Sequence, residues 1–337
     1  MRQMKKSWPI FLFSLSLLLL ASILLSLSTG EIKIRFWELW QAYRDPDSMA
    51  HNILCQIRLP RIVMAISVGG SLGLTGAILQ GIFRNPLVEP YTLGISGGAA
   101  FGVSLAIVTG LQLNVGAYML PLAGFAGALA SIFMVFSLSI NKGEANITRM
   151  LLVGVMVSFI ASSSMMLMMS ITTSDNLHGI IFWTMGSLDE PKTALIKLVF
   201  FSSLAGLALS YLFARPLNAL RLGEAQARHL GINTSVTIRV LFVIASLLTG
   251  VCVSVAGIIG FVGLIIPHVI RSIIGSDYRV VLLGSFLGGG VFLVISDIIA
   301  RTIISPNELP IGVITGMVGG LVFIVILKRM KASRSTS

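Results

Sequence analysis

The chain has 337 residues, of which 55% are hydrophobic and only 11% are charged, and its mean hydropathy is +0.94. A soluble core does not need so much apolar surface, whereas stretches of about 20 apolar residues cross a bilayer as helices because unpaired backbone groups are too costly in lipid. The composition therefore predicts an all-α polytopic membrane protein and argues against a soluble globular one.

Ten apolar stretches are expected to span the membrane. They cover residues 9–29, 61–82, 93–110, 117–139, 149–171, 193–213, 235–256, 259–274, 280–300 and 312–328. With the N-terminus inside, most of the 24 Lys and Arg residues fall in cytoplasmic segments, as the positive-inside rule requires. This distribution accounts for the net charge of +11 without a nucleic-acid partner. We therefore expect a multi-pass protein of the cytoplasmic (inner) membrane, in contact with lipid, with both termini in the cytoplasm.

The first span has features of a signal peptide, because Lys5 and Lys6 precede its apolar run. The run is long, however, and its end at Ser26 and Ser28 lacks a convincing small-residue cleavage pattern. We expect a retained first helix.

Two outer segments connect the predicted spans, residues 30–60 and 172–192. The first contains an aromatic stretch, residues 36–43, that we expect to form a short helix at headgroup level. Cys55 lies in this segment and Cys252 in a span, which favours neither a disulfide nor a metal site.

Three arginines stand at the outer mouths of spans. Arg58 and Arg61 precede the second span, and Arg301 follows the ninth. Such residues either anchor a helix at the interface or pair with carboxylates of a docking protein, which Arg contacts bidentately. For Arg301, a pair with Asp297 four residues earlier is the competing explanation.

Residues 84–98 interrupt the helical pattern with Pro86 and Pro90 and continue into a Gly- and Ser-rich helix start. Broken backbone survives at membrane depth only where it is buried in protein or lines a cavity. The segment is either an ordinary cytoplasmic turn or part of a cavity or gate. The small and polar residues that continue into the span favour the second interpretation.

The methionines and histidines are weaker indications of functional sites. Met165 and Met169 belong to a Met cluster in the fifth span that either lines a wide passage or packs in the core. His268 lies within a short span, where packing or a backbone hydrogen bond is the more common role. His51 and His178 on the outer side either touch a metal-bearing ligand or are solvated surface residues.

Residues 216–232 form a polar island between two long apolar runs. The island contains good helix formers, an acid at Glu224 followed by a base at Arg228, and glycines at positions 223 and 231. We expect a folded, helical segment that serves as a contact for another protein.

Small residues recur at every fourth position in three spans, a pattern that lets helix backbones approach closely in lipid. The members are Gly69, Gly73 and Ala77, then Gly284 and Gly288, and finally Gly312, Gly316 and Gly320. We expect tight packing of the bundle at these positions.

Two absences in the sequence restrict the functional class. No Lys directly follows a Gly, so the chain has no GxxxxGK[ST] phosphate loop, and any ATP must be hydrolysed by a partner. Asp297, near a span end, is the one midspan acid, which disfavours an ion-coupled secondary transporter. The spacing from Gly76 to Pro86 equals that from Gly257 to Pro267, a faint sign of an inverted repeat.

Six motifs follow one another along nearly the whole chain. They are Arg58-Leu-Pro-Arg61, Gly76-Ala-Ile-Leu-Gln80, Asn85-Pro-Leu-Val-Glu-Pro90 with Leu93-Gly-Ile-Ser-Gly-Gly98, Leu222-Gly-Glu-Ala-Gln-Ala-Arg-His-Leu-Gly231, Gly260-Phe-Val-Gly-Leu-Ile-Ile-Pro-His268 and Glu308-Leu-Pro-Ile-Gly312. In content and order this set resembles the FecCD-type permeases, the membrane subunits of ABC importers for iron-siderophore complexes, haem and vitamin B12.

The resemblance implies one transmembrane permease domain, residues 1–337, with the BtuC-like (type II) importer fold. Its ten helices would form inverted five-helix repeats, about residues 1–172 and 193–337. The implied partners are a second permease subunit (a copy or a paralogue), two cytoplasmic ATP-binding subunits and an outer substrate-binding protein. The permease itself would be no enzyme and would hold no cofactor or metal.

The resemblance also implies roles for individual residues. The ATPase would contact the loop after the sixth helix, at Leu222, Gly223, Glu224, Ala225, Arg228 and Gly231. The binding protein's acids would meet Arg58, Arg61 and Arg301. The cytoplasmic gate would lie at Asn85 and Leu87 and at the turn Asn146, Ile147 and Thr148. Met165 and Met169 are assigned to the translocation path on their side-chain chemistry alone. One departure is Leu321, which stands where the family often has a proline in its last helix.

Ferric siderophore is the commonest cargo that the resemblance implies, while haem, a corrinoid or an oxyanion such as molybdate stay open. The rival classes are an ion-coupled secondary transporter or channel, which needs no ATPase, and a membrane scaffold or receptor. The proline-broken spans and glycine stripes argue against a scaffold.

Overall fold

Each of the ten predicted spans corresponds to a helix in the computed structural model, which describes residues 7–30, 32, 34–35, 38–141, 144–145, 147–190 and 192–334. Among these residues, seven helical stretches are long and apolar enough to cross a membrane, and three shorter apolar helices complete the set. The spans are α2 (Trp8–Ser28), α5 (Leu59–Ile82), α6 (Ile95–Val108), α8 (Met119–Ser139), α9 (Ile147–Ile171), α11 (Thr193–Leu212), α14 (Thr234–Ala256), α15 (Val262–Ile274), α16 (Tyr278–Thr302) and α17 (Ile311–Arg334).

Short elements connect the spans. They are α3 (Leu39–Arg44), α4 (Met49–Asn52), the π-helix η2 (Ile53–Arg58), the 3-10 helix η3 (Pro90–Leu93), α7 (Leu111–Val115), β1 (Ile140–Asn141), β2 (Glu144–Ala145), α10 (Ser174–Met185), α12 (Ala214–Leu220) and α13 (Glu224–His229). β1 and β2 are two-residue strands that pair antiparallel at a turn, so the all-helical prediction holds for the architecture. The aromatic stretch is helical from Leu39 onward, and Phe36 and Trp37 lie outside the described residues.

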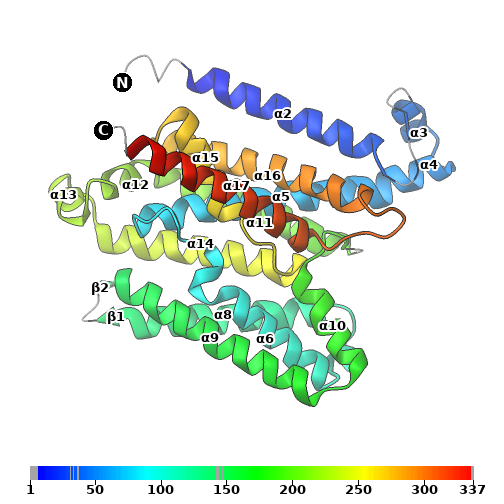
Figure 1. Cartoon of the computed structure of the whole chain (residues 1–337), viewed down its shortest axis with the longest axis horizontal. Coiled ribbons are helices and arrows are strands. Elements are labelled where there is room, and N and C mark those ends of the chain that lie inside the picture. Colours follow the sequence, from blue (N-terminus) through cyan, green and yellow to red (C-terminus); the bar gives the residue numbers. More distant parts are fainter. Residues whose placement is uncertain are drawn as a thin grey trace.

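The two ends of the bundle carry different connections (Figure 1). The start of α2, the end of α17, the segment with α12 and α13, and the β1–β2 turn lie at one end. α3, α4 and α10 lie at the other end. This arrangement is the one expected for an even number of spans, since the chain then begins and ends on the same side.

α5 is the central helix of the bundle. Within its apolar window 89% of the residues are buried, and its neighbours include α16, α14, α11 and α15. The predicted small-residue packing explains the closest of these contacts: a methyl group on Gly69 would collide with the backbone of Gly289 in α16, and one on Gly73 would collide with that of Ser285. Close backbone approach of this kind is how helices associate without a hydrophobic driving force.

The glycine stripe of α17 behaves differently. A methyl group on Gly312 would collide with the carbonyl oxygen of Met185, but no described atom lies within 4 Å of one placed on Gly316 or Gly320. The prediction of tight packing is therefore wrong for the latter two within this chain, because that face of α17 has no neighbouring helix here. Met317 and Leu321 on the same helix are exposed.

Two broken segments meet beside the middle of α5. A methyl group on Gly263, at the start of α15, would lie 2.7 Å from Cδ of Pro90 and 2.9 Å from the carbonyl oxygen of Leu72. Leu72 is halfway along α5, so the loop after α5 and the loop before α15 both reach this depth, and α6 and α15 are short for that reason. Residues 84–87 form a largely exposed turn, whereas residues 88–98 are buried or partly buried, so the interpretation as a broken segment inside the protein is supported for residues 88–98.

Candidate functional site

Residues 216–232 fold into α12 and α13 with a sharp turn between them. Gly223 at the turn has φ +112°, a conformation that side chains disfavour and glycine adopts freely. Glu224 begins α13, and Arg228 and His229 end it. This order places negative charge at the helix N-terminus and positive charge at its C-terminus, which complements the helix dipole.

One face of this segment is anchored and the other is open. Leu217 and Ala227 are fully buried in the core. Leu222 and Leu230 are 63% and 62% exposed. The prediction of a folded helical segment is confirmed, and its exposed leucines and charges form a surface that a protein partner can contact. Its role in coupling stays a prediction.

The charged pair of α13 is weak as a structural element. Arg228 Nη2 lies 3.8 Å from Glu224 Oε2, and Arg228 Nε donates a hydrogen bond to Thr234 Oγ1 at 3.0 Å. Exposed pairs of this type contribute about 0–1 kcal/mol. Both side chains can therefore change partners at little cost to folding.

A polar link that the sequence reasoning missed ties α12 to α16. Asn218 Nδ2 donates to Asp277 Oδ1 at 2.9 Å, and the backbone N–H of Tyr278 donates to Asn218 Oδ1 at 3.0 Å. Burial raises the pKa of Asp277, but hydrogen bonds from Asn218 and from the backbone and side chain of Arg279 outweigh this and hold it below its ordinary value. Asp277 directly before an apolar run is an N-cap signal; Asn218 carries no such signal.

The outer arginines form a buried ionic cluster with two acids. Arg61 donates through Nε to Asp297 Oδ1 and through Nη1 to Glu308 Oε2, both at 2.7 Å. Arg301 Nε donates to the second oxygen of Asp297 at 2.9 Å. The alternative explanation for Arg301, an intrahelical pair, is confirmed.

Backbone carbonyls hold the remaining guanidinium group. Arg58 donates to the carbonyl oxygens of Leu27 and Ile32, and Arg301 Nη2 donates to Ser26 Oγ at 2.8 Å. The cluster thus joins the end of α2, the start of α5 and the end of α16.

Burial changes what these arginines can offer a docking protein. Arg58 and Arg61 are 4% and 8% exposed, whereas the Glu308 side chain is 49% exposed. Within the described residues, acids and backbone carbonyls of the chain itself already bind these arginines. Their role in docking stays a prediction, and the accessible charge nearest to Arg61 is an acid.

The loop before α6 holds the start of α15. Glu89 Oε1 accepts a hydrogen bond from the backbone N–H of Phe261 at 2.7 Å, and the Tyr91 hydroxyl accepts one from Ile259 at 3.1 Å. Phe261 has φ +69°, which is uncommon for a residue with a side chain. Glu89 is therefore a carboxylate deep in the bundle, which corrects the expectation that Asp297 is the only one.

The predicted gate residues lie on two separate elements. Asn85 Oδ1 accepts from the backbone N–H of Leu87 at 3.0 Å in a local turn, and Leu87 is exposed. Ile147 packs partly against the core at the start of α9, and Thr148 beside it is exposed. Asn146 lies outside the described residues. The gate assignment stays a prediction.

The two path methionines face the interior of the chain. Met165 and Met169 are partly buried against a small cluster of Val103, Ile107 and Ile180 from α6 and α10. Met166 is the neighbour that is exposed. This geometry favours the core alternative for Met165 and Met169, and their place on a translocation path stays a prediction.

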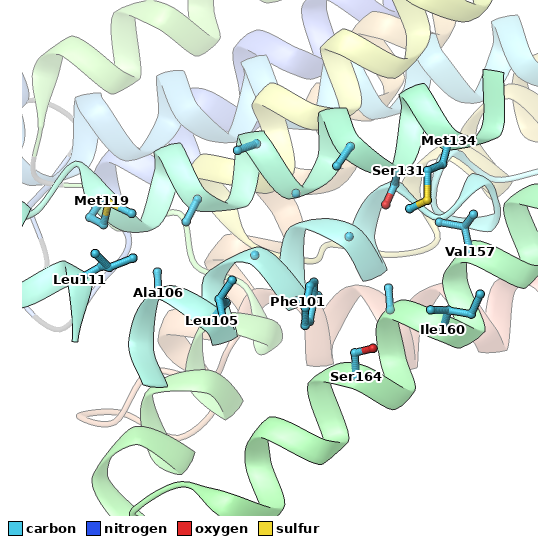
Figure 2. Close-up of a pocket in the computed structure, with 17 residues that line it drawn as sticks. Phe101, Leu105, Ala106, Leu111, Met119, Ser131, Met134, Val157, Ile160 and Ser164 are labelled. Atoms are coloured by element: carbon cyan, nitrogen blue, oxygen red, sulfur yellow. The ribbon is translucent and has the colours of Figure 1, made fainter. Parts of the chain in front are cut away.

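An apolar cavity of about 430 Å³ lies between α6, α8 and α9. Figure 2 shows Phe101 and Leu105 of α6, Met134 of α8 and Ile160 of α9 around it. Ser131 and Ser164 carry the polar side chains of this lining, and the lining includes no charged side chain. The cavity suits hydrocarbon and offers nothing to recognise a charged chelate.

The histidines do not gather with other metal ligands. His51 Nδ1 lies 3.2 Å from the carbonyl oxygen of Tyr43 and 4.0 Å from Sγ of Cys55. Within the part of the chain that the structure describes, no group of three or more His, Cys, Asp or Glu residues could hold a metal ion. His178 is exposed and His268 is partly exposed, and contact of any histidine with a ligand stays untested.

Sequence comparison identifies a family over most of the chain. Residues 18–329 match the model of the FecCD transport family. The chain is 37% identical over 326 residues to the hemin transport system permease protein HmuU of Yersinia pestis, which covers 95% of this chain and 97% of that protein. It is 38% identical over 321 residues to the vitamin B12 import system permease protein BtuC of Klebsiella pneumoniae, covering 95% and 94%.

Structural comparison agrees with the family match. A solved structure described as an inward-facing conformation of a metal-chelate type ABC transporter superimposes with a TM-score of 0.83 at 30% identity. The match covers 96% of this chain and 99% of that one.

Proposed function

Because the chain belongs to the FecCD transport family and has the fold of its ABC importer permeases, we propose that it carries a metal chelate inward across the cytoplasmic membrane. The first cargo to consider is a ferric siderophore. The observation that carries the proposal is the family match over residues 18–329, together with the structural match to a metal-chelate type transporter.

Energy for transport would come from two separate ATP-binding subunits on the cytoplasmic side. The sequence has no phosphate loop of its own. The segment 216–232 supplies a folded surface for such a partner, with Leu222 and Leu230 exposed and Glu224 and Arg228 in a long ion pair of 3.8 Å. In this proposal ATP binding moves this segment and so changes the relative stability of the inward- and outward-facing states.

α16 is the structural link between the two ends of the bundle. Asp277 and Tyr278 at its start bind Asn218 of α12, and Asp297 and Arg301 near its end belong to the outer ionic cluster. Its 25 residues span about 37 Å at 1.5 Å per residue. A displacement of α12 would therefore act on the outer cluster, where a substrate-binding protein would dock.

A second permease subunit, a copy or a paralogue, would complete the translocation path. Gly316 and Gly320 of α17 have open space beside them, and Met317 and Leu321 next to them are exposed. Small residues at this spacing permit close approach of another helix in lipid.

Haem is the second candidate cargo. The Yersinia pestis relative named for hemin transport is 37% identical and covers 95% of this chain. Vitamin B12 is the third, from the relatives named for it.

The test is uptake by the chain reconstituted in liposomes with its ATP-binding subunits and binding protein. Radiolabelled ferric siderophore, hemin and cyanocobalamin are offered separately, with molybdate as an oxyanion. We expect ATP-dependent uptake of one metal chelate. Uptake driven by an ion gradient without ATP, or uptake of molybdate alone, would contradict the proposal.

The same assay tests coupling through α13. Replacing Glu224 and Arg228 together by Ala should lower uptake and cargo-stimulated ATP hydrolysis at least about tenfold, the loss expected when a charged contact of about 1.4 kcal/mol or more is removed. The matched control is the double variant Asp175→Ala and Lys197→Ala. It removes one exposed acid in α10 and one exposed base near the start of α11, away from the segment 216–232. Full stimulation of hydrolysis in the Glu224/Arg228 variant would refute the coupling role.

A further inference from the structure

Three arginines from three separate elements converge on a small cavity. The cavity has a volume of about 220 Å³ and is lined by Gln80, Gly81, Arg84, Pro86, Arg221, Arg271 and Tyr278. These residues come from the end of α5, the turn after α12, α15 and the start of α16. Arg221 directly follows α12, and α12 and α13 lie at the same end of the bundle as the β1–β2 turn (Figure 1).

The back of the cavity is built from fixed, neutral groups. Gln80 and Tyr278 are buried. Gln80 Nε2 donates to the carbonyl oxygens of Val88, Gly263 and Leu264 at 3.0–3.3 Å, which orients its own oxygen toward Arg271. Arg271 donates to that Gln80 oxygen and hydrogen-bonds the Tyr278 side chain. Arg271 is thus held in place by groups that carry no charge.

The mouth of the cavity is formed by the other two arginines. Arg221 Nη1 donates to the carbonyl oxygen of Ser276 at 2.6 Å, and Arg221 is close enough to Arg271 to repel it. Arg84 Nη1 lies 3.6 Å from the position of a methyl group on Gly223, so its guanidinium reaches the turn between α12 and α13. Arg84 has φ +48°, a left-handed conformation that is uncommon for a residue with a side chain.

The positive charge of this cavity is not balanced by any acid that the structure describes. Among the described residues, no carboxylate forms an ion pair with Arg84, Arg221 or Arg271. The acid nearest in sequence, Asp277, is engaged by Arg279 and Asn218. Collecting like charges in a partly enclosed site is unfavourable unless an anion joins them.

We propose that this cavity binds a phosphate group. Guanidinium groups bind phosphate through paired, directional hydrogen bonds, and a dianionic or monoanionic oxyanion would offset the repulsion between Arg221 and Arg271. The volume is below the 300–1,000 Å³ of sites for drug-sized ligands, which fits a single anionic group. Basic pockets between membrane helices on the cytoplasmic side also bind phospholipid headgroups.

The site would connect anion binding to the moving parts of the transporter. Arg84 belongs to the broken loop after α5, Arg221 to the segment 216–232, and Arg271 to α15. One bound phosphate group would join all three. The proposal itself concerns binding alone and can be tested on the permease without its partners, so its outcome is independent of the cargo.

The test uses the full chain purified in a neutral detergent and stripped of lipid. In the first arm inorganic phosphate is titrated while the thermal unfolding midpoint is measured, with sodium chloride at equal ionic strength as the reference. In the second arm phosphatidylglycerol or phosphatidylcholine is added back to the stripped protein, and native mass spectrometry compares how much of each lipid stays bound. We expect saturable binding in at least one arm: a response to phosphate identifies a soluble anion, and retention of phosphatidylglycerol alone identifies a lipid headgroup.

Variants assign the binding to this cavity. Arg221→Gln should weaken it at least about tenfold, the loss expected for one hydrogen bond to a charged group, and Arg271→Gln should do the same. Arg221 is exposed, so its variant should fold even if the Arg271 variant does not. Arg215→Gln is the matched control, because Arg215 is an exposed arginine of α12 outside the cavity. Equal binding by the wild type and Arg221→Gln, or an unfolding midpoint that follows ionic strength alone, would overturn the proposal.

Discussion

At the scale of single residues, the outer ionic cluster shows how burial changes the role of a charge. Asp297 accepts hydrogen bonds from Arg61 and Arg301 at once, and its side chain is 1% exposed. A buried carboxylate is tolerable only with such partners, because desolvation of a lone charge costs several kcal/mol. The cluster therefore fixes the relative positions of α5 and α16 before any partner protein is present.

We predict that Arg61→Ala lowers the free energy of unfolding by about 3–5 kcal/mol, because it leaves Asp297 with one fewer partner in a buried site. Thermal or denaturant unfolding of the purified permease measures this. Glu308→Gln is the comparison: its side chain is half exposed, so the loss should stay below about 1 kcal/mol. Equal losses in the two variants would show that the cluster is not buried as described.

At the scale of elements, the contact between α5 and α15 has no room for a side chain. A methyl group on Gly76 would collide with the backbone carbonyl of Gly263, and one on Gly263 would collide with the ring of Pro90. Three elements thus meet at these two glycines, and Glu89 accepts a hydrogen bond from the N–H of Phe261. Since protein interiors deform little, a change at one of these elements is passed to the others.

Gly76→Ala should therefore destabilise the permease by about 1–3 kcal/mol through overpacking. The unfolding midpoint in detergent is the measurement. Gly179→Ala in α10 is the control, since the nearest atom to its new methyl group lies at an ordinary 3.7 Å. There the better helix propensity of Ala should leave stability unchanged or raised by up to about 1 kcal/mol. A Gly76 variant as stable as the control would contradict the close contact.

At the scale of the whole molecule, the bundle has one central helix and two functional ends. α5 is surrounded on most sides, whereas one face of α17 and large parts of α9 are not covered by any residue that the structure describes. Apolar side chains on those faces meet either lipid or another subunit. The glycines of α17 favour a subunit, because lipid tails do not require small residues.

Replacing Gly316 and Gly320 together by Leu should leave the single subunit folded, since no described atom lies within 4 Å of either position's added methyl group. Association of two permease subunits should decrease, because the added side chains hold the helices apart. Native mass spectrometry or light scattering in detergent gives the ratio of dimer to monomer. Ser14→Leu on the exposed face of α2 is the control for added bulk. An unchanged dimer would assign the interface to another face.

The sequence by itself determined the ten spans, the shared side of the two chain ends and the helical segment at 216–232. These are local properties: about 20 apolar residues form a helix long enough to cross the bilayer, and Gly223 and Gly231, both at positive φ, interrupt the helical backbone. The six motifs were sufficient to indicate the family, because their order runs over nearly the whole chain.

The tertiary structure alone decided which charges meet. Arg61 pairs with Asp297 and Glu308, which are 236 and 247 residues away, and no spacing in the chain encodes these partners. Glu89 lies in the loop after α5, and only the structure shows that its carboxylate accepts a hydrogen bond from Phe261 at the start of α15. Arg84, Arg221 and Arg271 lie far apart in sequence and share one cavity. In each case the outcome depends on how the helices pack, and packing brings together residues that local patterns treat separately.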